Sequence, residues 1–144
     1  MKRILVSLAI VLFAAGAASA DVIADREALM KERGGLLQGL SGAAKGEISY
    51  DAAAVMTQLQ ALQTNAAKGA DIDTLWPEGS AGNSEASPKI WEDRAGFKAA
   101  ADKYLADVEA LLASAPTDAA ALSAGFSEVA SNCGVCHRNF RVRK

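Results

Sequence analysis

The C-terminal residues 117–144 read TDAAALSAGFSEVASNCGVCHRNFRVRK. In this stretch the larger apolar residues and the cysteines recur at alternating intervals of four and three, at Leu122, Phe126, Val129, Cys133, Cys136 and Phe140. Residues at these intervals share one face of an α-helix. Because Pro116 ends the preceding element and Thr117 suits a helix N-cap, we predict a helix that starts at Thr117 and turns both cysteines inward.

The pentapeptide Cys133-Gly134-Val135-Cys136-His137 has the spacing of a c-type haem attachment motif. In such a motif the two thiols form thioethers with the vinyl groups, and the adjacent imidazole binds the iron. Other interpretations of the pair are weaker. A thioredoxin-like site needs the cysteines at a helix start, a disulfide across so short a loop adds little stability, and a zinc site lacks ligands in a chain with one His and two Cys. We therefore predict one haem c per chain, held by Cys133 and Cys136, with His137 as an iron ligand.

Two more helices are predicted upstream, over residues 22–44 and 49–68. The inward positions of the first are Val22, Leu29, Leu36, Leu37 and Leu40. Those of the second are Ala52, Val55, Leu59, Leu62 and Ala66, again at alternating intervals of three and four. Gly69 is expected to end the second helix.

Residues 70–87 form a turn-rich segment that is too long for a tight connection and suits a crossing loop. Ser87 is then expected as N-cap and Pro88 as first residue of a further helix, which Pro116 ends. Its inward positions are Ile90, Arg94, Phe97, Ala101, Tyr104, Val108 and Leu111. The predicted fold is all-α: an antiparallel four-helix bundle with a longer connection between its second and third helices and a covalent haem site near its C-terminus.

The N-terminal residues 1–20 have the features of a secretory signal peptide. Lys2 and Arg3 precede the apolar run 4–13, and Ala18-Ser19-Ala20 supplies small residues before a cleavage site at Asp21. An uncleaved anchor is the alternative. We expect residues 21–144 to form the mature domain, exported and not inserted in a membrane after cleavage.

Composition excludes two classes of function. The 144 residues hold 15 Lys and Arg against 17 Asp and Glu, a net charge of −2, whereas nucleic-acid binding needs a clustered basic excess. With the single His assigned to haem, the sequence shows neither a distal His nor a Ser/His/Asp arrangement, so we expect no enzyme.

The mature chain resembles the class II c-type cytochromes, the cytochrome c′ family with its low-spin relatives. The resemblance is carried by Arg26-Glu27-Ala28-Leu29-Met30-Lys31, Lys45-Gly46, Tyr50-Asp51, Leu75-Trp76-Pro77, Ser87-Pro88-Lys89-Ile90-Trp91 and the C-terminal Cys133-Gly134-Val135-Cys136-His137-Arg138-Asn139-Phe140-Arg141. It implies a bacterial periplasmic haem protein, often a homodimer through its first two helices, which exchanges electrons with redox partner proteins.

With His137 the only histidine, the second axial ligand of the iron can be Met, Lys, solvent or a gas molecule but not another imidazole. The identity of this ligand separates two functions. In the family, the residue four after the arginine matched by Arg26 points at the distal face of the haem, and Met30 occupies that position. A ligating Met implies a low-spin electron carrier, whereas its absence implies a five-coordinate protein that binds NO or CO. Met56 is the only other methionine after the leader, and its apolar neighbours explain it as a core residue.

Three further residues are candidates for contact with the haem. Arg26 can pair with a propionate through its planar guanidinium. The resemblance places Glu85 by the haem edge and Arg141 close to the proximal imidazole. Arg141 also belongs to a basic C-terminal segment that can complement the helix dipole or dock an acidic redox partner.

Overall fold

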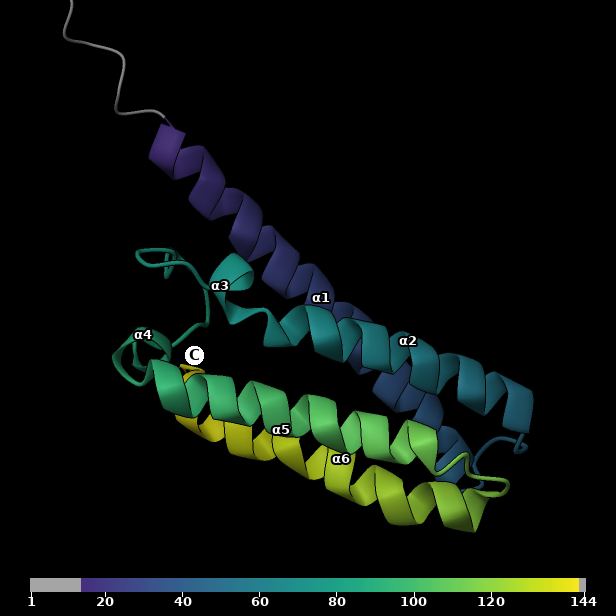
Figure 1. Ribbon diagram of the computed structural model, residues 1–144. Coiled ribbons are helices and arrows are strands. Elements are labelled where there is room, and N and C mark those ends of the chain that lie inside the picture. Colours follow the sequence, from purple (N-terminus) through teal and green to yellow (C-terminus); the bar gives the residue numbers. More distant parts are fainter. Residues whose placement is uncertain (1–13, 143–144) are drawn as a thin grey trace, which may run out of the picture.

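A computed structural model describes the backbone of residues 14–142 and the side chains from residue 21 onward. Its elements are α1 (Ala14–Ala44), α2 (Ala52–Ala70), α3 (Ile72–Leu75), α4 (Lys89–Glu92), α5 (Arg94–Ala113) and α6 (Ala119–Phe140). The four long helices lie side by side and alternate in direction, with α2 and α6 returning toward the end where α3 and α4 lie (Figure 1). α1 packs on α2 and α6, and α5 packs on the same two helices. The predicted all-α four-helix bundle is confirmed.

Aspartates cap three of the long helices. The side chain of Asp51 accepts a hydrogen bond from the amide of Ala54 at the start of α2, and Asp118 accepts one from Ala121 at the start of α6. The prediction that Thr117 caps the last helix is therefore wrong by one residue. Asp118 takes the extended backbone that aims its carboxylate at the first turn.

The third predicted helix is divided in two. Asp93, at φ −122° and ψ 62°, interrupts it between α4 and α5, and its side chain accepts from the amide of Gly96, 3.0 Å away. Ser87 Oγ still accepts from the amide of Lys89, but Pro88 precedes α4 as its cap residue rather than being its first residue. An aspartate can cap a new helix by accepting a hydrogen bond from the amide three residues later, even where the apolar pattern continues through it.

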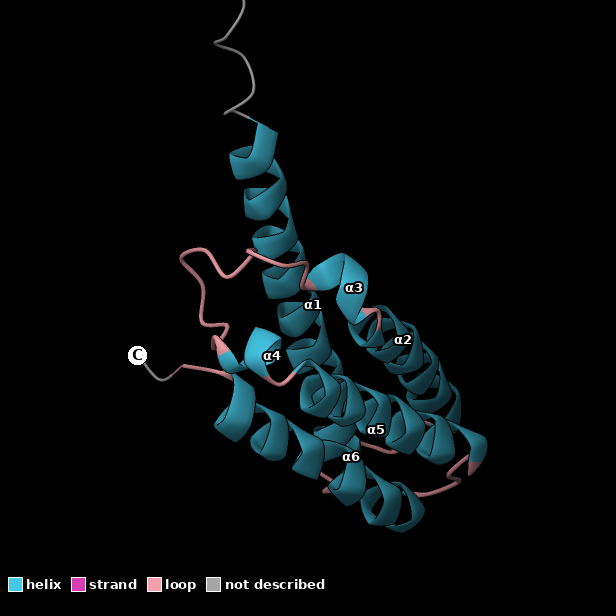
Figure 2. Cartoon of the chain, turned by 60° about the vertical axis from the view of Figure 1, so that its left-hand side comes forward, coloured by secondary structure: helices cyan, strands magenta, loops and turns pink. Residues whose placement is uncertain are grey.

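The long connection between α2 and α5 contains the single turn α3, which the sequence did not indicate. From α3 the chain passes the N-terminal part of α1 and reaches α4 (Figure 2). Gly69, expected to end α2, instead lies inside it and is buried. A side chain at this position would meet Arg33 Nη2 and Leu29, so the close packing of α1 on α2 favours glycine here.

The core has two clusters. The first is mainly aliphatic and spans all four long helices: Leu40, Ala43, Val55, Leu59, Leu62, Ala66, Tyr104, Val108, Leu111, Leu122 and Val129. The second lies where α3 and α4 meet the bundle: Leu29, Ile72, Leu75, Trp76, Ile90, Phe97 and Phe140. Most predicted inward positions are buried here, but Ala52 is exposed, since it lies in the first turn of α2.

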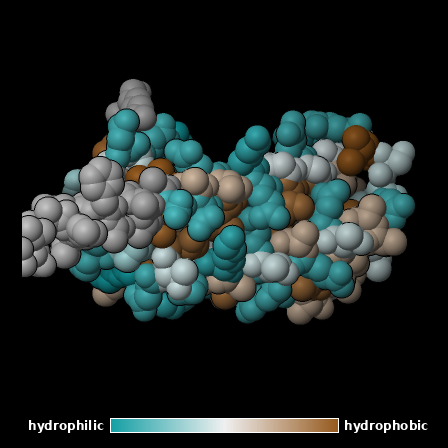
Figure 3. All heavy atoms as spheres, turned by 90° about the horizontal axis from the view of Figure 1, so that it is seen from above, coloured by the Kyte–Doolittle hydropathy of each residue, from teal (hydrophilic) through white to brown (hydrophobic). Residues whose placement is uncertain are grey.

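The described part of the chain contains no helix long and apolar enough to cross a membrane. On the face in Figure 3, polar residues predominate and the apolar groups between them are small and separate. The predicted leader lies mostly outside the described residues, and residues 14–20 continue the backbone of α1.

Candidate functional site

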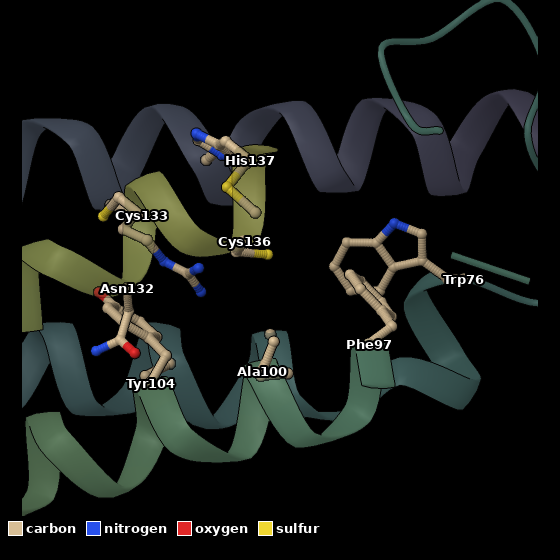
Figure 4. Close-up of a pocket in the computed structure, with 13 residues that line it drawn as sticks. Trp76, Phe97, Ala100, Tyr104, Asn132, Cys133, Cys136 and His137 are labelled. Carbon is tan, nitrogen blue, oxygen red and sulfur yellow. The ribbon is translucent and has the colours of Figure 1, made fainter. Parts of the chain in front are cut away.

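The predicted haem attachment motif, Cys133 to His137, lies near the end of α6, on the side that faces the second core cluster. Cys133 and Cys136 are half-buried, and His137 is more exposed. All three residues line one pocket, and Cys136 points across it toward Trp76 and Phe97 (Figure 4). The helix continues through the motif to Phe140, so the spacing of i, i+3 and i+4 keeps the two thiols and the imidazole together.

Two adjoining cavities meet at this motif. The larger, of about 530 Å³, reaches toward Arg26, Glu85 and Arg141, and its volume is that of an ordinary ligand site. The smaller, of about 70 Å³, extends toward Cys133 and the middle of the bundle. Both cavities are lined by Met30, Trp76, Phe97, Cys136 and His137.

An aromatic wall closes one side of the cavities. Trp76 and Phe97 meet edge to face with centroids 5.0 Å apart, and Phe97 meets Phe140 in the same way at 5.2 Å. Such edge-to-face pairs hold rings in fixed orientations and present a rigid apolar surface. The wall is suited to a flat apolar macrocycle.

Met30 lies on α1 and lines both cavities together with His137, while its side chain is 37% exposed. Met56 instead packs against the first core cluster, as its apolar neighbours predicted. The structure therefore brings the first methionine to the motif and leaves the second among aliphatic side chains.

Arg26 is buried and binds the long connection. Its Nε donates to the carbonyl of Leu75 at 2.5 Å, its Nη1 donates to the carbonyl of Ser80 at 2.9 Å, and its Nη2 donates to Ser80 Oγ. The guanidinium carbon also lies 5.5 Å from the ring centre of Trp76 and 5.9 Å from that of Trp91. Burial lowers the pKa of Arg26 from its ordinary value. Arg26 is thus a clamp between α1 and the connection, and it lines the larger cavity as well.

Glu85 and Arg141 form an ion pair at the edge of the larger cavity. Arg141 Nε donates to Glu85 Oε2 at 2.6 Å, and both side chains are about half-exposed. The backbone joins the same two segments, because the amide of Val142 donates to the carbonyl of Glu85 and the amide of Ser87 donates to that of Phe140. The two residues that the sequence singled out separately are therefore partners.

Sequence reasoning passed over a polar group beside the smaller cavity: Arg33 and Tyr104 line the cavity, and Asn65 binds Arg33. Arg33 Nε donates to Asn65 Oδ1 at 2.9 Å, and its guanidinium carbon lies 4.4 Å from the ring centre of Tyr104. Burial raises the pKa of Tyr104 to about 12. One signal was available in the sequence: Arg33 stands three residues after Met30 and so shares its helix face.

Burial also shifts the pKa values of the motif residues. It raises the pKa of the Cys133 and Cys136 thiols and lowers that of His137, which the nearby cations Arg141 and Arg33 lower further. The imidazole is therefore neutral at pH 7, and the neutral ring is the form that binds a metal.

The residues present fit a haem. Two thiols, a neutral imidazole and a thioether surround a cavity with aromatic walls, and arginine side chains reach its edge, where propionates need cations. Among the described residues, no group of three or more His, Cys, Asp or Glu forms a separate metal site.

Comparison with known proteins agrees with this chemistry. The family model described as Cytochrome C' matches residues 21–141. Among curated relatives, a cytochrome c-556 of Agrobacterium fabrum is 38% identical over 126 residues, covering 88% of this chain and 84% of the relative.

Solved structures show the same fold. A cytochrome c' from Rhodobacter spheriodes aligns with a TM-score of 0.80 and 28% identity over 88% of this chain and 98% of the other. A nitric oxide complex of a cytochrome c prime variant from Alcaligenes xylosoxidans aligns with a TM-score of 0.78 and 26% identity, covering 87% and 97%.

Proposed function

The chain belongs to the cytochrome c′ family, whose members carry a covalently attached haem c, and on that premise we propose that it is a periplasmic electron carrier. In this proposal Cys133 and Cys136 would hold the haem through thioethers, and His137 and Met30 would bind its iron. The observation that carries the proposal is the shared lining: Met30 on α1 and His137 on α6 border both cavities.

When bound, the haem supplies a one-electron centre that alternates between ferric and ferrous iron. The chain's own residues bind and orient it. His137 presents a neutral imidazole, and the thioether of Met30 is an uncharged donor that favours the ferrous state. The rings of Trp76, Phe97 and Phe140 exclude water from the apolar side of the site. At its edge, Arg26, or Arg141 after release from Glu85, is the partner for a propionate.

A second function is favoured by the nitric oxide complex among the structural neighbours. If Met30 stays off the iron, His137 is the single protein ligand, and the opposite face is open to NO or CO. The partial exposure of Met30 supports this alternative, because an exposed thioether has room to move away.

We place the protein outside the cytoplasm because residues 1–20 have the pattern of a signal peptide. The family match begins at residue 21, directly after the predicted cleavage site. Its expected partners are redox proteins and, through α1 and α2, a second copy of the chain.

The spectrum of the purified protein tests the axial ligands. With Met30 bound, the ferric protein is low-spin with a weak long-wavelength sulfur-to-iron charge-transfer band, and CO binds slowly. Met30→Leu keeps a similar volume, costs less than about 1.5 kcal/mol in packing, and should produce a high-spin protein that binds CO readily. Met56→Leu is the matched control and should leave the spectrum unchanged. A wild-type protein that is already high-spin and binds CO readily would refute the electron-carrier assignment and support the gas-binding one.

Attachment is tested separately by acid–acetone extraction. Wild-type protein should keep its haem, and Cys133→Ala with Cys136→Ala should lose it. Haem that stays covalently bound in the double variant would mean that other residues form the bonds.

A further inference from the structure

Arg33 brings a positive charge into the haem site that neither the attachment motif nor the axial ligands require. It lies on α1, half-buried, three residues after Met30. It lines the smaller cavity together with Cys133, Cys136 and His137.

The guanidinium is held in place by two buried residues. Arg33 Nε donates to Asn65 Oδ1 at 2.9 Å, and Arg33 Nη2 reaches the Asn65 carbonyl at 3.4 Å. Asn65 is itself only 3% exposed and donates to the Leu29 carbonyl at 3.1 Å and to Glu32 Oε2 at 2.8 Å. The guanidinium carbon of Arg33 also lies 4.4 Å from the centre of the Tyr104 ring, whose face attracts a cation.

The charge of Arg33 is not cancelled by a direct ion pair. Among the residues with described side chains, no carboxylate lies within 4.0 Å of its guanidinium, and the nearest link leads through Asn65 to the exposed Glu32. Of the two other arginines that line the cavities, Arg141 is paired with Glu85. Arg26 has no ion pair with a described carboxylate either, but its three guanidinium nitrogens all bind the long connection.

We propose that Arg33 is a fixed positive charge that raises the reduction potential of the haem, and that Asn65 and Tyr104 are its positioning residues. The proposal rests on haem attachment at the motif described above. Reduction adds one electron and lowers the charge of the site by one, so a nearby cation stabilises the reduced state more than the oxidised state. Because the guanidinium is half-buried, solvent and salt screen it less than a surface charge.

The test is a spectroelectrochemical titration of the haem-loaded chain. Arg33→Gln should lower the potential, weakening reduction by about tenfold, which is ~59 mV for a one-electron couple. Arg33→Lys keeps the charge and should stay close to wild type. Lys45→Gln makes the same change in net charge at an exposed position that lines neither cavity, and it should have little effect, most of which disappears in high salt. The shift from Arg33→Gln should persist in high salt.

Each other outcome overturns the proposal. An unchanged potential in a fully haem-loaded Arg33→Gln protein would show that the charge does not reach the haem. Equal falls in the reduction potential of the Arg33→Gln and Arg33→Lys variants would assign the effect to packing. If Arg33→Gln does not hold haem, Arg33→Met removes the same charge with an apolar chain, and loss of haem from both neutral variants but not from Arg33→Lys would assign the charge to haem retention instead. Failure of the attachment site itself would look different, because the wild-type protein would then lack covalent haem.

Discussion

Replacing Arg26 with Leu tests whether the clamp between α1 and the long connection stabilises the fold. The substitution removes the donors to the carbonyls of Leu75 and Ser80 and to Ser80 Oγ. Ser80 is 2% exposed, so its carbonyl would lose its partner in a place that water reaches poorly. Ser80 Oγ keeps one bond, to the carbonyl of Pro77 at 2.6 Å.

The expected cost follows from the acceptors left behind. A buried acceptor without a donor costs about 1–3 kcal/mol. With two carbonyls affected, we expect a loss of roughly 3 kcal/mol, a large part of the 5–15 kcal/mol or so that stabilises a domain of this size. The corresponding fall in Tm is about 10 °C.

Guanidinium chloride unfolding of the haem-loaded protein, followed by far-ultraviolet circular dichroism, measures this loss. Arg94→Leu is the matched control, because Arg94 also donates to backbone carbonyls beside α3, those of Ile72 and Trp76, both at 2.8 Å. Its side chain is 31% exposed, its ion pair with Asp73 lies at the surface, and the carbonyl of Ile72 keeps the amide of Trp76 as a donor, so about 1 kcal/mol should be lost. A loss below about 1 kcal/mol in Arg26→Leu, or equal losses in the two variants, would refute the argument that burial gives the clamp its strength.

Two further predictions concern α6 and its contact with α5. Asp118→Ala should cost about 1 kcal/mol in urea unfolding while Thr117→Ala costs only a few tenths, and the reverse order would contradict the observed cap. Hydrogen bonds from Lys103 and Asn132 lower the pKa of Asp107, so its stabilising contribution is present above the unfolded pKa and is lost as the pH falls through the lower folded value. Asp107→Asn should therefore reduce the acid-side decline of the urea midpoint, and an unchanged pH dependence would show that the carboxylate contributes nothing.

The helices could be predicted because their inward positions repeat regularly. Val55, Leu59, Leu62 and Ala66 are buried as their spacing indicates. The boundaries were less predictable, because they depend on single hydrogen bonds of aspartates. Asp93 interrupts an apolar pattern that continues on both sides of it. Only the hydrogen bond that its side chain accepts from the amide of Gly96 shows where α5 begins.

The candidate site also has one part that the sequence predicted and one part that it did not. The two thiols and the imidazole are local in sequence, so the motif alone predicted that they lie together. The group of Arg33, Asn65 and Tyr104 comes from three helices, and none of these residues has a pattern that indicates the others. A sequence gives the face of a helix on which an arginine lies, whereas its partner depends on how the helices pack.

The packing explains how one bundle can support both an electron carrier and a gas-binding protein. The large hydrophobic side chains that are less than 2% exposed all belong to the first cluster, and none of them lines either cavity: Leu40, Leu59, Leu62, Val108, Leu122 and Val129. Met30 contributes little to that packing, being 37% exposed beside the cavities. Because Met30 adds little to that packing, replacing this side chain should leave the bundle folded. Under the proposed function, Met30 would therefore decide between the two activities by binding the iron or leaving it open.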